Sequence, residues 1–123
     1  MKTVYKLVKR VDDKLVSIKT KGLGQVVYTL NKWSQSPEHL RDKNYNLCVL
    51  KKLKVAIYVQ SKYEKDSIIL KCEAKDVYDT DKLPYLSSDD LSNGTFSSED
   101  ENLKWPSMCK VMAKKIRPIK EIT

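Results

Sequence analysis

Hydrophobic and polar residues alternate along the first third of the chain, which is the pattern of strands with one buried face. The alternation runs through residues 3–10 and 14–20 and, after a glycine-containing turn, through residues 25–33. Asp12-Asp13 marks a first tight turn, in which aspartate is common. Because both connections are short, we expect the three strands to pair as an antiparallel meander.

The middle of the chain changes from strand spacing to helical spacing. Residues 34–46 are polar and predict a loop, with a helical turn that begins at Pro37 and that Ser36 could cap. After a short buried segment at 47–50, apolar residues recur at helical spacing through residues 51–63, with lysines on the opposite face. This last stretch is the best helix candidate in the chain.

Two more strands are predicted in the second half. Residues 67–78 alternate most clearly, and residues 107–117 form a last strand that Pro118 should either end or place at a sheet edge. Residues 79–102 have no period and are rich in Ser, Asp and Asn, which predicts a long loop. The order of elements predicts an α+β fold, a small, mainly antiparallel sheet of about five to six strands with one packed helix.

Length and composition indicate a single globular domain. The chain has 123 residues, of which 41% are hydrophobic and 33% charged. We expect one domain over residues 1–123 with a long acidic, serine-rich loop at about 79–104. No apolar run approaches the roughly 18 residues of a membrane span, and the N-terminal residues lack the apolar core of a secretion signal. We therefore expect a cytoplasmic protein without a membrane partner, whose three cysteines are buried reduced thiols: Cys48, Cys72 and Cys109.

The charge of the chain is unevenly distributed. The net charge is +8, but residues 79–101 hold seven acids and one lysine, or −6, which leaves +14 for the rest. A basic body fits an anionic partner such as nucleic acid, nucleotide or phosphate. An AT-rich genome would produce the same excess, since 21 of the 24 basic residues are lysine. The three arginines, Arg10, Arg41 and Arg117, stand out because guanidinium binds phosphate through two parallel hydrogen bonds.

No catalytic set is apparent in the sequence. The one histidine, His39, lies in the polar loop, and no serine has the G-x-S-x-G context of a hydrolase nucleophile. Adjacent carboxylates occur in turns among polar neighbours, whereas acid–base catalysis by such a pair would need burial to raise a pKa. No cluster of metal-ligating residues and no cofactor motif is present. We therefore expect a protein that is not an enzyme and has no catalytic residue, metal or cofactor.

Aromatic residues supply candidate contacts for a nucleotide base. We expect most of the ten aromatics to be core or rim residues, since an aromatic on a strand of a small sheet is usually core, but Tyr85, Phe96 and Trp105 lie in or beside the acidic loop. Each of these three either anchors the loop or contacts a ligand. Asn93 is equally open, because Asn93-Gly94 is a turn dipeptide and an asparagine amide also fits the edge of adenine.

Five segments of the chain together form a recognisable layout: VYKLVK, DDKLVSI, VVYTLNKWSQSP, IILKCEA and WPSMCKVMAKKIRPIKEI. Its most specific points are Tyr28, Trp33, Pro37, Trp105 and Pro106. This layout, which covers nearly all 123 residues except 79–104, resembles the anti-Thoeris sponge family of small phage proteins.

The resemblance implies a function and an assembly. A protein of this family sequesters a cyclic ADP-ribose isomer (glyco-cyclic ADP-ribose) without degrading it, and so keeps the host's Thoeris NADase effector inactive during immune evasion. It implies a homodimer or higher homo-oligomer in the host bacterial cytoplasm, with the ligand near subunit contacts. An arginine would then hold the pyrophosphate while an aromatic ring stacks on the base.

Six residues follow as candidate ligand contacts from the basic, aromatic and loop positions together: Arg10, Tyr28, Asn93, Phe96, Trp105 and Arg117. For Arg10 and Arg117 an ordinary surface ion pair is the competing interpretation, and for Trp105 it is a packing role at the return of the loop. Two other functions remain open. The basic charge also fits a phage regulatory protein that binds nucleic acid, and scattered residues could form an enzyme that processes NAD or ADP-ribose.

Overall fold

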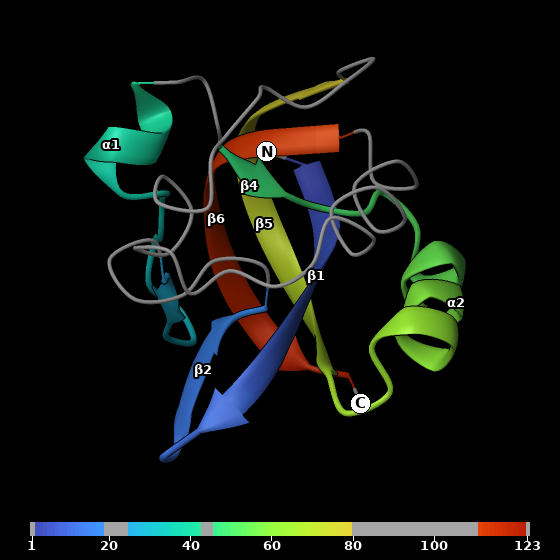
Figure 1. Ribbon diagram of the computed structural model, residues 1–123. Helices are drawn as coiled ribbons and strands as arrows, with labels where there is room; N and C mark the ends of the chain where they lie inside the picture. Colours follow the sequence, from blue (N-terminus) through green and yellow to red (C-terminus); the bar gives the residue numbers. More distant parts are fainter. Residues whose placement is uncertain (1, 19–24, 43–45, 80–110, 123) are drawn as a thin grey trace.

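The computed structural model describes residues 2–18, 25–42, 46–79 and 111–122, which form one curled antiparallel sheet with two helices (Figure 1). The strand order is β3-β2-β1-β5-β6-β4, and every neighbouring pair is antiparallel. The predicted α+β class is confirmed. In chain order the elements are β1 (Lys2–Val11), β2 (Lys14–Ser17), β3 (Val27–Tyr28), α1 (Glu38–Arg41), β4 (Leu47–Cys48), α2 (Leu53–Tyr63), β5 (Ile68–Asp79) and β6 (Val111–Glu121).

The predicted N-terminal meander is present, with a two-residue turn between its first two strands. Asp12 and Asp13 have φ of 50° and 65°, so both occupy the left-handed region that matches the twist of a hairpin. Aspartate tolerates this region better than most residues with a Cβ atom. The turn sets the register Val11↔Lys14. The third strand is shorter than predicted, because only Val27–Tyr28 pairs with β2.

Two isolated bridges curl the sheet back on itself. Tyr5 of β1 exchanges backbone hydrogen bonds of 2.8 and 2.9 Å with Leu50, so it has one partner on each edge, Lys71 and Leu50. Ser34 exchanges bonds of 2.8 and 3.0 Å with Ile116 of β6. The segment between β3 and α2 therefore pairs with the sheet at two points, once with β1 and once with β6.

The curl separates two hydrophobic clusters. Alternate residues point to opposite faces of a strand, so Val4 and Val8 face inward while Leu7 faces α2. The inner cluster consists of Val4, Val8, Leu15, Val26, Tyr28, Leu47, Val49, Leu70, Cys72, Ala74, Ala113 and Ile116. The outer cluster, which packs against α2, consists of Leu7, Leu40, Cys48, Leu50, Ala56, Val59, Ile69 and Met112.

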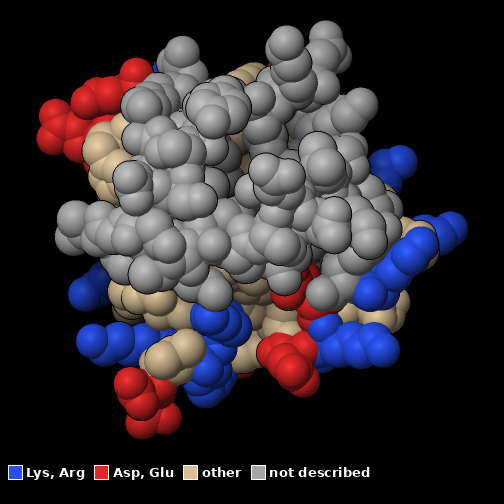
Figure 2. All heavy atoms as spheres, in the orientation of Figure 1, with Lys and Arg blue, Asp and Glu red and all other residues tan. Residues whose placement is uncertain are grey.

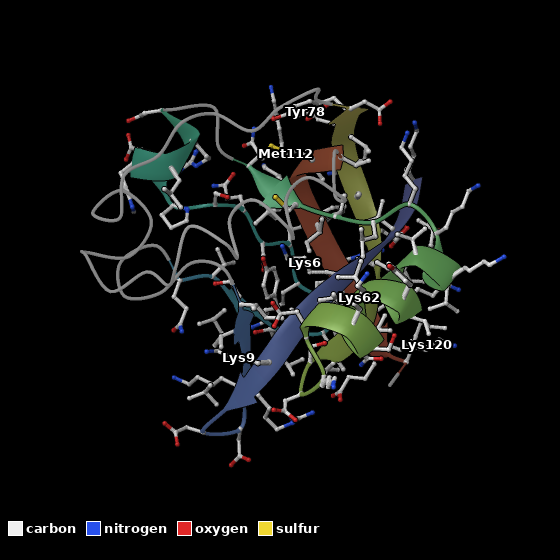
Figure 3. All side chains as sticks on the ribbon, turned by 45° about the vertical axis from the view of Figure 1, so that its right-hand side comes forward. Lys6, Lys9, Lys62, Tyr78, Met112 and Lys120 are labelled. Carbon is white, nitrogen blue, oxygen red and sulfur yellow. The ribbon has the colours of Figure 1, made fainter. Side chains whose placement is uncertain are left out.

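Polar side chains also tie the returning segment to the sheet. Lys6 is 8% exposed, and its Nζ donates a hydrogen bond of 2.7 Å to the carbonyl oxygen of Cys48 (Figure 3). Tyr78 and Met112 lie side by side in Figure 3, and the Tyr78 hydroxyl lies 3.4 Å from the Met112 sulfur. Asn46 Nδ2 donates to the same hydroxyl at 2.8 Å. These bonds fix the start of β4 against β5 and β6.

Two details of the sequence prediction are wrong. The helical turn at Pro37 exists as α1, but no side chain caps it, and Ser36 is 2% exposed. Pro118 does not end the last strand, which continues to Glu121. Pro118 lies opposite Cys72, next to a register shift at which β6 has one extra residue, Ile119. The carbonyl oxygen of Pro118 accepts a hydrogen bond from Asn31 rather than from β5, so its missing N–H costs no bond of the β5–β6 ladder.

Part of the predicted organisation lies outside the described residues. This holds for the acidic loop from residue 80 onward and for residues 107–110 of the predicted last strand. In the described part of the chain, no helix combines the length and the apolar character that crossing a membrane requires.

Candidate functional site

The strongest candidate site is an aromatic ring flanked by two cations on the outer surface of β5 and β6. The bridge Ser34↔Ile116 places Trp33 beside Arg117. The Arg117 guanidinium carbon lies 5.5 Å from the centre of the Trp33 ring, and Lys75 Nζ of β5 lies 4.3 Å from it. Both distances are within the range of about 6 Å in which a cation is attracted to an aromatic face. Trp33 stays 36% exposed, so a ligand can reach the ring from solvent.

The Arg117 guanidinium pairs with a carboxylate, but not all of its N–H groups have a hydrogen-bond partner among the described residues. Its NH2 group donates to Oε1 of Glu73, the residue directly opposite on β5. Its Nε is buried and has no hydrogen-bond partner in the part of the chain that the structure describes. A buried donor without a partner is uncommon and calls for an explanation. We call the four residues Trp33, Glu73, Lys75 and Arg117 the Trp33 patch.

The Trp33 patch continues into a shallow depression through the side chain of Lys75. The depression has a volume of about 300 Å³ and is lined by Lys2, Ala74, Lys75, Asp76 and Val77. This is the lower end of the usual volume of small-molecule sites, about 300–1,000 Å³. It lies where β1 begins, since Lys2 pairs with Ala74 and β5 runs on beyond it.

Basic side chains are spread over the described surface, and Lys115, which pairs with Lys75 of the patch, is one of them. In the view of Figure 2, lysine and arginine side chains spread along the margins of the described surface, with acidic side chains in small groups between them. Lys114 and Lys115 of β6 and Lys120 near its end are exposed. A surface of this kind attracts anions over distances of about a Debye length, roughly 8–10 Å at moderate salt.

The structure does not bring the six sequence candidates together. Arg10 lies at the far end of β1, where its NH2 group makes an exposed ion pair of 2.7 Å with Glu121. This is the ordinary surface pair that was the competing interpretation for both arginines. Asn93, Phe96 and Trp105 lie outside the described residues. Of the three candidates that the structure describes, Arg10, Tyr28 and Arg117, only Arg117 belongs to the Trp33 patch.

Tyr28 is a core residue and offers no ring face to a ligand at the surface. It is 2% exposed in the inner cluster, and its hydroxyl has no hydrogen-bond partner among the described residues. Burial, with smaller contributions from Cys72 and Cys48, raises the pKa of the Tyr28 hydroxyl above its usual value. Burial also raises the pKa of the Cys72 thiol to about 12, which the nearby Lys6 ammonium partly opposes. The expectation that Cys48 and Cys72 are buried free thiols is confirmed.

Sequence reasoning missed Trp33 and Lys75 as members of a site. Trp33 carried a signal, because it ends a predicted strand in polar surroundings and is a specific point of the family resemblance. Lys75 carried none, since it is one lysine among many. Its role depends on the register between β5 and β6, which no local pattern encodes.

We also looked for a metal site and for similar proteins. In the ranges that the structure describes, no group of three or more His, Cys, Asp or Glu side chains could hold a metal ion. No protein-family model, curated protein or solved structure matches the chain.

Proposed function

We propose that this protein binds an anionic nucleotide-type small molecule at the Trp33 patch and sequesters it without chemical change. The observation that carries the proposal is the exposed Trp33 ring with two cations, Lys75 and Arg117, near its centre, together with an Arg117 Nε that has no partner among the described residues. An exposed ring binds the face of a base, and adjacent cations bind phosphate. The specific ligand that we propose is a cyclic ADP-ribose isomer, which carries an adenine and two phosphates, as in the anti-Thoeris sponge family.

Sequestration requires a high affinity of the site for its ligand. A sequestering protein competes with an effector by mass action, so it needs a Kd of tens of nanomolar, or about −10 kcal/mol. Stacking on one aromatic ring contributes about 1–3 kcal/mol per base, and each hydrogen bond to a charged group contributes about 1.5–3 kcal/mol. A half-open surface patch alone falls short of this total once the cost of immobilising the ligand is included.

This shortfall supports a homo-oligomer. A second copy over the Trp33 patch would exclude water and strengthen each ionic contact. Several large apolar side chains near the β3 end of the sheet also remain exposed on the monomer: Val11 (42%), Val27 (46%) and Leu30 (39%). We therefore propose a homodimer or higher assembly in the host cytoplasm. Light scattering coupled to gel filtration, with and without ligand, tests the assembly, and a monomer under both conditions would contradict it.

Calorimetry with a cyclic ADP-ribose isomer tests the binding proposal. We expect Trp33→Ala and Lys75→Met each to weaken binding by about tenfold or more, the loss of one stacking or ionic contact. Tyr58→Ala is the matched control, because Tyr58 of α2 is also an exposed ring (45%) beneath a lysine, Lys62, whose Nζ lies 5.5 Å from its centre. Equal losses in all three variants would contradict a specific site at Trp33.

Recovery of the ligand separates sequestration from catalysis. After incubation and heat denaturation of the protein, chromatography of the supernatant should return the intact cyclic molecule. A hydrolysed or linearised product would instead identify an enzyme.

Nucleic-acid binding is the alternative function, because a ring with lysines beside it is also a platform for single-stranded nucleic acid. A salt titration separates the two functions. Binding to nucleic acid weakens log-linearly with salt in proportion to the number of phosphates contacted. A ligand with two phosphates should show a shallow dependence, and a steep slope with an oligonucleotide would favour the alternative.

A further inference from the structure

We infer that Asp76, in the depression beside the Trp33 patch, recognises the vicinal hydroxyl groups of a ribose. The inference rests on the proposed function and specifies the ligand class further. The ligand would be a nucleotide whose ribose carries free 2′- and 3′-hydroxyls.

The first observation is the backbone at Asp76. This residue lies inside β5, yet its φ is 54°, in the left-handed region. A residue with a Cβ atom adopts this conformation in a strand only when its surroundings hold it there, and such residues concentrate at functional sites. Ladder partners are defined for Lys75 and Val77 on either side of Asp76, opposite Lys115 and Ala113. The turn of the backbone sets the direction of the Asp76 side chain apart from that of a regular strand residue.

The second observation is the electrostatic environment. Asp76 is exposed and lines the depression together with Lys2 and Lys75, yet no ion pair joins its carboxylate to either ammonium group. In the described ranges Asp76 has no hydrogen-bonded or ion-paired partner. The carboxylate is therefore an acceptor that its own neighbours leave available.

The third observation is the position of Lys75. Its Nζ lies 4.3 Å from the centre of the Trp33 ring, and its side chain also lines the depression. A ligand that spans both places therefore has its base on Trp33, its phosphate at Lys75 and its sugar in the depression. A carboxylate accepts hydrogen bonds from the two neighbouring hydroxyls of a ribose, which is how acidic residues recognise this sugar in dinucleotide sites.

The test compares two nucleotides that differ only in these hydroxyls, ADP and 2′,3′-dideoxy-ADP. We expect the wild-type protein to bind ADP about tenfold more tightly, the effect of a hydrogen bond to a charged acceptor. Asp76→Asn keeps the shape and tolerates the left-handed backbone. Asp76→Gly removes the carboxylate at a position that glycine adopts without strain. Both variants should lose most of the preference for ADP while their affinity for dideoxy-ADP stays within about twofold.

Asp13 provides the matched control. It is also an exposed aspartate with a positive φ, 65°, but it lies in the β1–β2 turn. Asp13→Gly should leave both affinities unchanged. If the wild-type protein binds the two nucleotides equally but Trp33→Ala weakens both, the ribose assignment is wrong and the Trp33 patch stands. If neither nucleotide binds, the inference fails, since it requires a nucleotide at the patch. A preference for ADP that survives in both Asp76 variants also overturns it.

Discussion

Replacing Tyr28 by phenylalanine tests two conclusions: that the ring is a core residue, and that burial of its hydroxyl lowers the free energy of unfolding. The hydroxyl is buried and has no hydrogen-bond partner within the described ranges, and the ring is 2% exposed. Tyr28→Phe removes the oxygen and leaves the ring in place. Burying a hydroxyl without a partner costs about 1–3 kcal/mol in proteins, so the variant should be more stable by about that amount.

The magnitude is measurable in a domain of this size. One kcal/mol shifts the Tm of a chain between 100 and 150 residues by roughly 3–6 °C. Urea denaturation at pH 7 gives the same difference as a change in midpoint with an unchanged m-value. Tyr58→Phe is the control, because the Tyr58 hydroxyl is exposed and accepts a hydrogen bond of 3.0 Å from Lys62. Its free energy of unfolding should change by no more than about 0.5 kcal/mol.

Alkaline pH provides a second test of the same group. Burial raises the pKa of the Tyr28 hydroxyl, so the unfolded chain ionises at this position before the folded chain does. Below the ordinary tyrosine pKa, about 10, the hydroxyl is neutral in both states and the free energy of unfolding does not depend on pH at this position. Above it, ionisation in the unfolded chain lowers the free energy of unfolding of the wild type by about 1.4 kcal/mol per pH unit. Tyr28→Phe removes this loss, so its advantage should grow between pH 9.5 and 11. A variant less stable than wild type at pH 7 would refute the reasoning, since the hydroxyl would then have a partner in solution.

Three further predictions follow from the core and from the Trp33 patch. Leu70→Ala, at a side chain that is 0% exposed, should lower the free energy of unfolding by about 2–5 kcal/mol in urea denaturation; a loss under 1 kcal/mol would contradict its place in the inner cluster. Cys72, whose pKa burial raises to about 12, should react with a disulfide reagent at pH 8 only after urea unfolds the protein, and wild-type stability should fall as pH rises from about 9 toward 12; rapid labelling of the folded protein would show the thiol to be accessible. Glu73→Gln should release Arg117 at a stability cost below about 1 kcal/mol, since the pair is partly solvated, and should tighten calorimetric binding of the cyclic ligand; weaker binding would mean that Glu73 positions Arg117 rather than competing for it.

Strand and helix positions were predictable because each depends on a local period. The alternation over residues 67–78 became β5, and the helical spacing over 51–63 became α2. The failures concern interactions that the local pattern does not contain. A proline normally ends a strand, but β6 continues through Pro118, whose carbonyl oxygen bonds to Asn31 rather than to β5, so the missing N–H removes no bond between β5 and β6.

The candidate site was less predictable, for a related reason. The sequence marked Arg117 as a phosphate ligand by its chemistry, and the structure adds its partner Glu73 and its neighbour Trp33. Tyr28 and Trp33 lie five residues apart in one predicted strand, residues 25–33. Which of them is buried depends on the path of the chain after β3, where Ser34 bridges to Ile116.

The sequence by itself determined the α+β class, the hairpins and the basic charge of the chain, since short-range periodicity, turn chemistry and composition are properties of neighbouring residues. Only the tertiary structure decided how the sheet curls. The bridges at Tyr5 and Ser34 join residues far apart in the chain, and loop closure of this kind leaves no local signal. That curl buries Tyr28 and leaves Trp33 at the surface between Lys75 and Arg117.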